Sequence, residues 1–144
     1  MSDAHPPERP QEVADFLRQH PETRAVDAIF ADLSGVVRGN RYPIDDLDKI
    51  FTHGLAFPGS AFLLDVVGES HDPAGLGFSD GDPDVPAFAI PGTLAPVPWA
   101  PKPLAQVLLG FRNEDGSPYP YEPRNVLARV ANEIAGLDLR PVVA

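Results

Sequence analysis

The stretch Gly77 to Trp99, GFSDGDPDVPAFAIPGTLAPVPW, decides the fold that we predict for this chain. It joins an acidic turn to two short apolar runs, and prolines recur too often in it for a long helix. We therefore expect a tight acidic loop that leads into two extended segments, Pro86 to Ile90 and Thr93 to Val97. Each segment is expected at an edge or end of a sheet, because proline cannot donate a hydrogen bond to an interior ladder.

The acidic turn carries Asp80, Asp82 and Asp84, with the alternating spacing that begins an EF-hand calcium loop. The remainder of that motif is absent, because Val85 stands where the loop needs glycine and Pro91 where it needs glutamate. We therefore expect no calcium site. The predicted turn is solvated, and its carboxylates hydrogen-bond to the backbone and anchor the strand that follows.

Outward from this stretch, hydrophobic periodicity and turn residues predict further helices and strands. Towards the N-terminus we expect a short helix, a hairpin that turns at Ser34–Gly35, a second helix capped by Asp45, and a buried strand. Towards the C-terminus we expect a central strand and a third helix that ends at Gly136. The expected helices span residues 11–20, 45–53 and 122–135, and these outer strands span residues 25–33, 36–44, 61–67 and 104–111. Together they predict an α+β fold, in which a helix crosses one face of a mostly antiparallel sheet.

Composition limits the classes of protein to which the chain can belong. Its 144 residues are enough for one domain, and 11 Lys and Arg against 21 Asp and Glu give a net charge of −10. This acidity argues against binding to nucleic acid or to an anionic membrane. The absence of cysteine excludes disulfides and thiolate metal sites, and the polar N-terminus has no apolar signal region. We expect a cytoplasmic protein.

Catalytic motifs are missing from the chain taken by itself. Gly75, Gly77 and Gly81 do not have the spacing of a phosphate-binding loop, and no Ser-His-Asp or Cys-His set is evident. The four histidines are scattered, so we expect no zinc site. No strand carries the carboxylates that two hard cations require. We therefore assign no catalytic residue and no metal ligand to this chain.

Five short motifs follow one another along the chain: D-P-D at 82–84, P-G-T at 91–93, P-W at 98–99, D-G-S-P at 115–118 and E-P-R at 122–124. In this order they resemble the N-terminal β-grasp domain of the glutamine synthetase family. The resemblance is closest to the gamma-glutamylpolyamine synthetase-like branch, which joins glutamate to amines such as polyamines. It implies a β-grasp fold of the α+β class, with a mixed or antiparallel sheet and a crossing helix.

The resemblance also implies a division of the chain into three parts. Residues 1–24 form an N-terminal arm and short helix, residues 25–112 the β-grasp domain, and residues 113–144 a linker, the first helix of a catalytic domain and the start of a strand. In the family, this strand continues into a metal-binding E-x-E-F motif. Because the chain stops on the apolar run 141–144, we expect a fragment that is truncated before its catalytic domain.

The reaction that the resemblance implies is that of an ATP-dependent ligase. In the family, ATP phosphorylates the γ-carboxylate of glutamate at a site with Mg²⁺ or Mn²⁺, and ammonia or an amine then attacks to form the amide. Identical subunits form a stacked-ring homo-oligomer in which neighbours share each active site. The chain by itself is expected to lack the ATP and metal site and to be inactive.

We expect this chain to contribute one loop, residues 57–60, to such a shared site. Glutamine synthetases carry F-D-G-S-S here, and the resemblance implies that the aspartate helps to bind ammonium in the neighbouring subunit. The proline that replaces it neither attracts a cation nor accepts its protons, which favours an amine larger than ammonia. The residues expected to line the substrate site are Phe57, Pro58, Gly59 and Ser60 of this loop, together with Arg38 and Arg124.

Other interpretations stay open. The chain is alternatively a non-catalytic, stand-alone β-grasp interaction module or a decayed subunit, or an α+β domain whose likeness to the family is coincidental. An open reading frame that continues past Ala144 into an E-x-E strand distinguishes the ligase from the module. The plainer alternatives are an exposed cross-strand charge for Arg38 and a surface turn for the loop.

Overall fold

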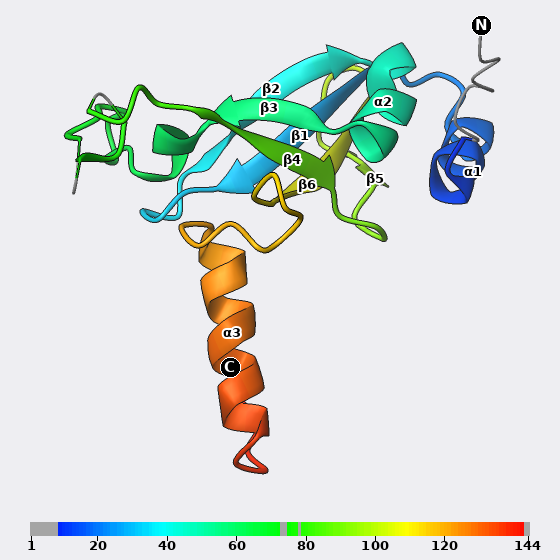
Figure 1. Cartoon of the computed structure of the whole chain (residues 1–144). Coiled ribbons are helices and arrows are strands. Elements are labelled where there is room, and N and C mark those ends of the chain that lie inside the picture. The colour runs from blue at the N-terminus through cyan, green and yellow to red at the C-terminus, as the bar shows by residue number, and fades with distance from the viewer. Residues whose placement is uncertain (1–8, 73–74, 78, 143–144) are drawn as a thin grey trace, which may run out of the picture. The chain divides into compact units, whose positions relative to one another are not determined.

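The computed structural model describes residues 9–72, 75–77 and 79–142. The helices are α1 (Gln11–Gln19), α2 (Leu47–Thr52) and α3 (Pro123–Ala135), and short 3₁₀ helices are η1 (Ile44–Asp46) and η2 (Gly59–Phe62). The strands are β1 (Ala25–Ala31), β2 (Val37–Pro43), β3 (Leu55–Pro58), β4 (Asp84–Ala89), β5 (Ala95–Pro96) and β6 (Leu104–Phe111), as Figure 1 shows. Within the described residues, the helices are too short or too polar to cross a lipid bilayer.

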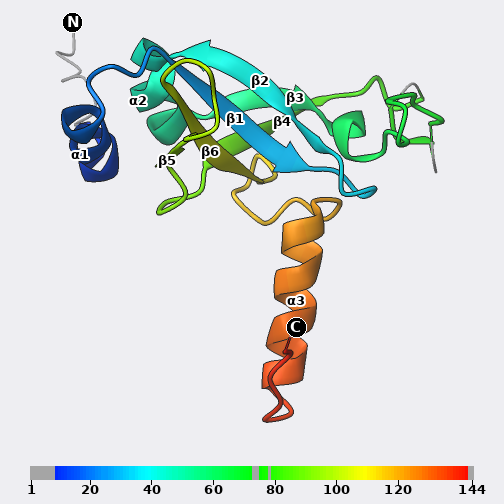
Figure 2. The ribbon, with the colours of Figure 1, turned by 180° about the vertical axis from the view of Figure 1, so that it is seen from behind.

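The strands form one mixed sheet in the order β2-β1-β6-β4-β3, and β5 pairs antiparallel with β6. At its centre β1 and β6 are parallel, with Ala25 opposite Leu104 and Ile29 opposite Leu108. Both ribbon views show these two strands side by side (Figure 1 and Figure 2). The first strand therefore lies beside the last one at the middle of the sheet, which is the β-grasp topology. The α+β class and β-grasp type predicted from the sequence are confirmed.

The central strand β6 forms over residues 104–111 as predicted. Its residues Ala105, Val107, Leu109 and Phe111 are buried, and the alternate positions are half-buried. This alternation arises because successive side chains of a strand point to opposite faces of the sheet. A run of apolar residues with one face fully covered and the other partly covered is typical of a strand in the middle of a sheet.

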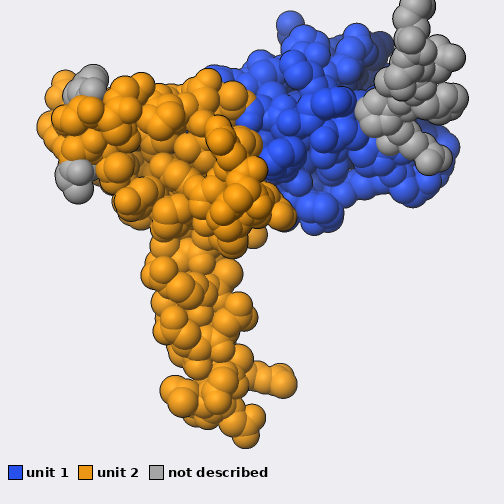
Figure 3. All heavy atoms as spheres, viewed as in Figure 1, with its two compact units in different colours: residues 1–30, 38–55, 87–109 blue, residues 31–37, 56–86, 110–144 orange. Residues whose placement is uncertain are grey.

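By its contacts the chain divides into two compact units (Figure 3). Unit 1 comprises residues 1–30, 38–55 and 87–109, and unit 2 comprises residues 31–37, 56–86 and 110–144. Each unit is thus assembled from segments that lie far apart in the sequence. The three-part domain division expected from the resemblance stays a prediction.

Unit 1 contains the first two helices, both of which were predicted. Their buried residues are Val13 and Phe16 in α1 and Leu47 and Ile50 in α2. A polar contact is added by Glu12 of α1, whose carboxylate accepts the N–H of Gly92 at 2.9 Å. The amphipathic pattern of each helix therefore places its apolar face in the core of the unit.

The start of the second helix differs from the prediction. The segment begins with η1, and neither η1 nor α2 has a side-chain cap hydrogen bond, so the capping role expected for Asp45 is wrong. Pro43 occupies the N-cap position of η1, which places Asp45 inside the 3₁₀ turn. A residue caps a helix only from the position before its first turn.

Strand β4 lies inside the sheet, between β6 and β3, so the edge position predicted for its proline is wrong. The Pro86 carbonyl accepts the N–H of Arg112, the residue that follows β6, at 3.0 Å. The N–H and C=O of one strand residue point to the same side, so the missing N–H of Pro86 faces Arg112, beyond the last residue of β6, and not a residue of that strand. The second predicted segment, residues 93–97, is reduced to the two residues of β5.

The buried strand predicted over residues 61–67 is also wrong. The end of η2 and a loop occupy this segment, and Val66 and Val67 are 73% and 76% exposed. The Asp65 carboxylate accepts the N–H groups of Val67 and Glu69, at 2.9 Å each. These side-chain bonds offer the backbone an alternative to a strand ladder, and they outweigh the apolar composition of the run.

The third helix forms as predicted, as α3, and Gly136 follows its last residue. No residue of α3 is buried, and Leu127 is 68% exposed. The start of a strand that we expected after this helix is wrong for residues 137–142, which have no regular strand. The remainder of that expected strand, residues 143–144, lies outside the described part of the chain.

Candidate functional site

The Phe57–Ser60 loop of unit 2 comprises the last two residues of β3 and the first two residues of η2. Phe57 is 6% exposed and Gly59 is buried, whereas Pro58 is exposed and Ser60 is half-buried. The Phe57 ring lies 5.8 Å from the ring of Phe111, measured between centroids. The loop therefore presents Pro58 at the surface between two buried residues.

The acidic turn holds the C-terminal half of this loop. The Asp82 carboxylate accepts two hydrogen bonds from Ser60, from its backbone N–H at 2.9 Å and from its hydroxyl at 2.8 Å. The N–H of Gly59 donates to the Pro83 carbonyl at 3.1 Å. We expected the turn to anchor the strand after it, but Asp82 holds a residue that lies 22 positions earlier in the chain.

The conformation of the acidic turn is fixed by its own side chains. One Asp80 oxygen accepts the N–H of Gly77 at 2.8 Å and that of Asp82 at 2.9 Å. Asp82 has φ +48°, a left-handed conformation that aspartate adopts more readily than most residues. The side-chain-to-backbone hydrogen bonds predicted for this turn are therefore confirmed.

Tyr119 lies beside Gly59 of the loop. A Cβ atom at Gly59 would lie 2.8 Å from the Tyr119 hydroxyl oxygen, so a larger residue does not fit there without a shift. The Tyr119 ring also lies 5.8 Å from Phe62 and 5.5 Å from Tyr121, between centroids. Burial raises the pKa of Tyr119, and the charges of Tyr121, Asp80 and Asp82 act in the same direction.

The E-P-R-N segment joins the start of α3 to the end of β6. The Glu122 side chain is 2% exposed, and it accepts the N–H of Phe111 and the side-chain amide of Asn125, at 2.8 Å each. The same amide reaches the carbonyl oxygens of Phe111 at 3.1 Å and Tyr119 at 3.0 Å. Burial raises the pKa of Glu122, while the Phe111 N–H and then Arg124 act in the opposite direction. Arg124 itself is exposed in the first turn of α3.

Arg38 lies on β2 in unit 1 and is half-buried. On the same strand, Arg41 forms a two-point ion pair with Asp27, at 2.7 and 2.9 Å. The hydrogen bond to Asp27 and then its charge raise the pKa of Arg41. Among the residues described in unit 2, the structure brings the Phe57–Ser60 loop together with Asp82, Pro83 and Tyr119, which the sequence had not assigned to the site. The D-P-D motif, which contains Asp82 and Pro83, was the one sign of these contacts in the sequence.

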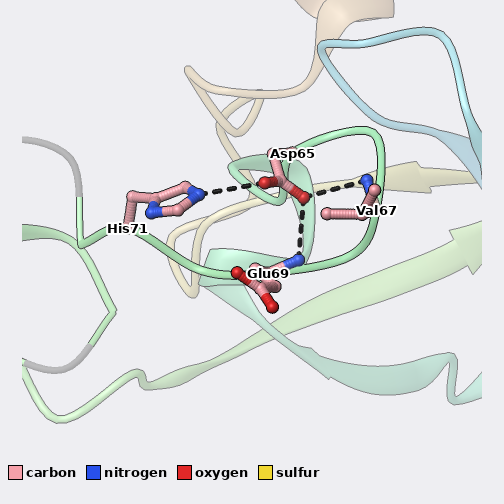
Figure 4. Close-up of polar contacts among 4 residues, drawn as sticks. All are labelled: Asp65, Val67, Glu69 and His71. Atoms are coloured by element: carbon pink, nitrogen blue, oxygen red, sulfur yellow. Dashed lines mark hydrogen bonds and ion pairs between the residues drawn. The ribbon is translucent and has the colours of Figure 1, made fainter.

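A second polar group lies in the loop after η2, as Figure 4 shows. Asp65, Glu69 and His71 each offer one ligand atom, and these atoms lie within 4.8 Å of one another. One Asp65 oxygen lies 2.9 Å from Nε2 of His71, and the other accepts loop N–H groups. These bonds, with that to His71 the largest, lower the pKa of Asp65 to about 2. Because Mg²⁺ prefers an octahedron of oxygen ligands, this mixed and internally bonded set does not fit it.

Comparison with known proteins gives a consistent result, although no protein-family model matches the chain. The chain is 40% identical over 134 residues to the gamma-glutamylputrescine synthetase PuuA of Escherichia coli (strain K12), covering 93% of this chain and 28% of that protein. It is 32% identical over 115 residues to a glutamine synthetase of Pyrococcus horikoshii, covering 80% of this chain and 23% of that protein. A solved structure of a GmaS/ADP complex matches with a TM-score of 0.66 and 28% identity, over 90% of this chain and 26% of that chain.

The parallel β1–β6 pair, flanked by β2 on one side and β4 and β3 on the other, defines an α+β domain of the β-grasp class. Together, the fold and these similarities identify the chain as a member of the glutamine synthetase family, homologous to its N-terminal β-grasp domain. The chain spans 28% of the length of the gamma-glutamylputrescine synthetase and 23% of the length of the Pyrococcus horikoshii glutamine synthetase.

Proposed function

We propose that this chain forms part of an ATP-dependent ligase of the glutamine synthetase type, which makes a gamma-glutamyl amide from glutamate and ammonia or an amine. The observation that carries this proposal is the 40% identity over 134 residues to a gamma-glutamylputrescine synthetase. A further relative, 32% identical over 111 residues, is the gamma-glutamylethanolamide synthetase GlnA4 of Streptomyces coelicolor. Both names specify amines larger than ammonia, which favours such an amine here. The proposal includes a cytoplasmic location and a stacked-ring homo-oligomer.

ATP supplies the phosphoryl group that activates the γ-carboxylate of glutamate, and Mg²⁺ or Mn²⁺ balances the charge of the phosphates. Within the described residues, the Asp65, Glu69 and His71 group does not fit this role, because its atoms already bond to one another and to the loop backbone. We therefore assign the nucleotide and the metals to parts of the ligase outside this chain. To this chain we assign one wall of the substrate site.

In the proposed ligase, the Phe57–Ser60 loop shapes the side of the site that receives the amine. Pro58 is exposed and neutral, and its ring has no acceptor for the protons of an ammonium ion. It does offer apolar surface, which the carbon chain of a larger amine covers with a gain of about 25 cal/mol per Å². Arg124 in unit 2 and, separately, Arg38 in unit 1 are further proposed contacts, because a guanidinium pairs well with anionic substrate groups.

Expression of the complete reading frame that carries this chain tests the proposal. With glutamate, ATP and Mg²⁺, we expect phosphate release that depends on an amine, with a higher kcat/KM for putrescine or ethanolamine than for ammonia. The Pro58→Asp variant should move this preference towards ammonia by about tenfold, because a carboxylate accepts protons from a small cation. Pro58→Ala is the control that removes the ring without adding charge. If neither ammonia nor an amine yields an amide, the ligase proposal fails and the non-catalytic interaction module replaces it.

A further inference from the structure

Asp82 connects the acidic turn to the loop that we place at the substrate site. Its two carboxylate oxygens accept both donors of Ser60, the backbone N–H at 2.9 Å and the hydroxyl at 2.8 Å. Two bonds to one residue fix its backbone direction and its side-chain rotamer together. We propose that Asp82 is a positioning residue, which sets the place of Pro58 and thereby the selectivity for the amine. This inference rests on the proposed ligase function.

The position of Pro58 depends on contacts on both of its sides. On the N-terminal side, Phe57 is 6% exposed and its ring lies 5.8 Å from that of Phe111. On the C-terminal side, the Gly59 N–H donates to the Pro83 carbonyl at 3.1 Å, next to the two bonds between Ser60 and the turn. The first contact belongs to the apolar core, and the second is polar and lies nearer the surface. Removal of the Asp82 side chain therefore removes two of these three bonds on the C-terminal side of Pro58 and leaves the core contact in place.

The chemistry of the Ser60–Asp82 contact provides a graded set of variants. Asparagine keeps two bonds, because its amide oxygen accepts the Ser60 N–H and its amide nitrogen donates to the Ser60 hydroxyl oxygen. It also tolerates the positive φ of +48° at this position. Alanine keeps neither bond. Asp84, an exposed acid of the same D-P-D motif, provides the matched control for loss of a negative charge.

Amide hydrogen exchange of the 144-residue chain, followed by NMR, tests the contact without any catalysis. In the Asp82→Ala chain, we expect the Ser60 and Gly59 amides to exchange at least about tenfold faster, because their hydrogen-bonded partners are lost or displaced. The Ile90 amide, which donates within the sheet at 2.8 Å, should keep its protection. Asp82→Asn and Asp84→Ala should leave all three amides near their wild-type rates.

Steady-state kinetics of the complete reading frame test the positioning role. We expect Asp82→Ala to raise the KM for the amine by at least about tenfold, with the KM values for glutamate and ATP unchanged, because a small displacement of a site wall has a large effect on the group that it contacts. Asp82→Asn should return the amine KM to within about threefold of wild type. In a Pro58→Gly background, Asp82→Ala should add less than about threefold, since the residue through which it acts is absent.

Three results overturn the inference. One is unchanged exchange at Ser60 in the Asp82→Ala chain, and another is an unchanged amine KM in the Asp82→Ala ligase. The third is an equal rise of all KM values that asparagine does not rescue, which indicates a general structural role. Failure of the proposed function has a different signature, because the wild-type protein then forms no amide. The positioning role fails with it, and the exchange rates still decide whether Asp82 holds Ser60.

Discussion

Replacement of Glu122 by alanine should destabilise the start of α3, because it removes the acceptor that joins this helix to β6. The side chain is 2% exposed, and its carboxylate accepts the N–H of Phe111 and the side-chain amide of Asn125 at 2.8 Å each. The Asn125 amide has two further acceptors, the carbonyl oxygens of Phe111 and Tyr119 at 3.1 and 3.0 Å. The bond whose loss is not compensated within this group is therefore the one from the Phe111 N–H.

The magnitude follows from that single bond. A buried donor left without its acceptor costs about 1–3 kcal/mol, so we expect Glu122→Ala to lower the free energy of unfolding by about 2 kcal/mol. Glu122→Gln is the matched variant, because its amide oxygen still accepts the Phe111 N–H. Glu114→Ala, at an exposed position of the nearby turn, should change the free energy by less than about 0.5 kcal/mol.

The pH dependence gives a second, independent test of Glu122. Burial raises its pKa in the folded chain above that in the unfolded chain, so between the two values the folded state holds a proton that the unfolded state has lost. The contribution of Glu122 is therefore full below the unfolded pKa, and it is lost as the pH rises through the folded pKa. As the pH rises above the unfolded pKa of glutamate, about 4.3, wild type should lose stability relative to Glu122→Gln, which does not titrate.

Urea unfolding of the 144-residue chain, followed by circular dichroism at several pH values, measures both effects. The reasoning is refuted if Glu122→Ala unfolds within about 0.5 kcal/mol of wild type. It is also refuted if the difference between wild type and Glu122→Gln does not vary with pH.

Three further predictions concern separate parts of unit 2. His71→Ala should raise the pKa of Asp65 from about 2, because the bond to His71 is the largest cause of its depression, and NMR titration measures this shift. The stabilisation that Asp65 contributes to the fold is present above its unfolded pKa and is lost as the pH falls through its folded pKa. Gly59→Ala should cost about 1–3 kcal/mol, since its Cβ would lie 2.8 Å from the Tyr119 hydroxyl oxygen, and Tyr119→Phe in the same chain should recover part of this loss in urea unfolding. Leu127→Gln on α3 should leave the urea midpoint almost unchanged, because Leu127 is 68% exposed, and a large loss would show that this face is packed in solution.

The sequence predicted best the elements whose signals are local and strong. The β6 run has apolar residues at every second position, and the α3 segment has proline at its first turn and glycine after its end. These patterns act through neighbours within a few residues, and so they predict the correct element without knowledge of the fold. Where two local signals compete, the prediction fails: at residues 61–67 the apolar run favoured a strand, and the bonds accepted by Asp65 favoured a turn.

The position of an element in the sheet was harder to predict than its type. Pro86 was assigned to an edge because proline lacks an N–H. In β4, however, the Pro86 nitrogen faces Arg112, which follows the last residue of β6. Proline is disfavoured only at positions where its N–H would face a partner strand, and which positions these are depends on the lengths of the neighbouring strands. Strand lengths are set by the tertiary structure, so no local pattern contains the answer.

For the candidate site, the sequence and its family resemblance were enough to select the Phe57–Ser60 loop, because its replacement of aspartate by Pro58 is visible in the letters alone. They did not predict that Asp82 accepts both donors of Ser60, since the two residues are 22 positions apart and meet only when the chain is folded. The same holds for the parallel pairing of β1 with β6, which joins two distant ends of the domain. Composition, periodicity and motif order thus account for the α+β class and the family, because these depend on near neighbours. The contacts that position the loop depend on the closure of long segments of chain, and only the folded structure contains that information.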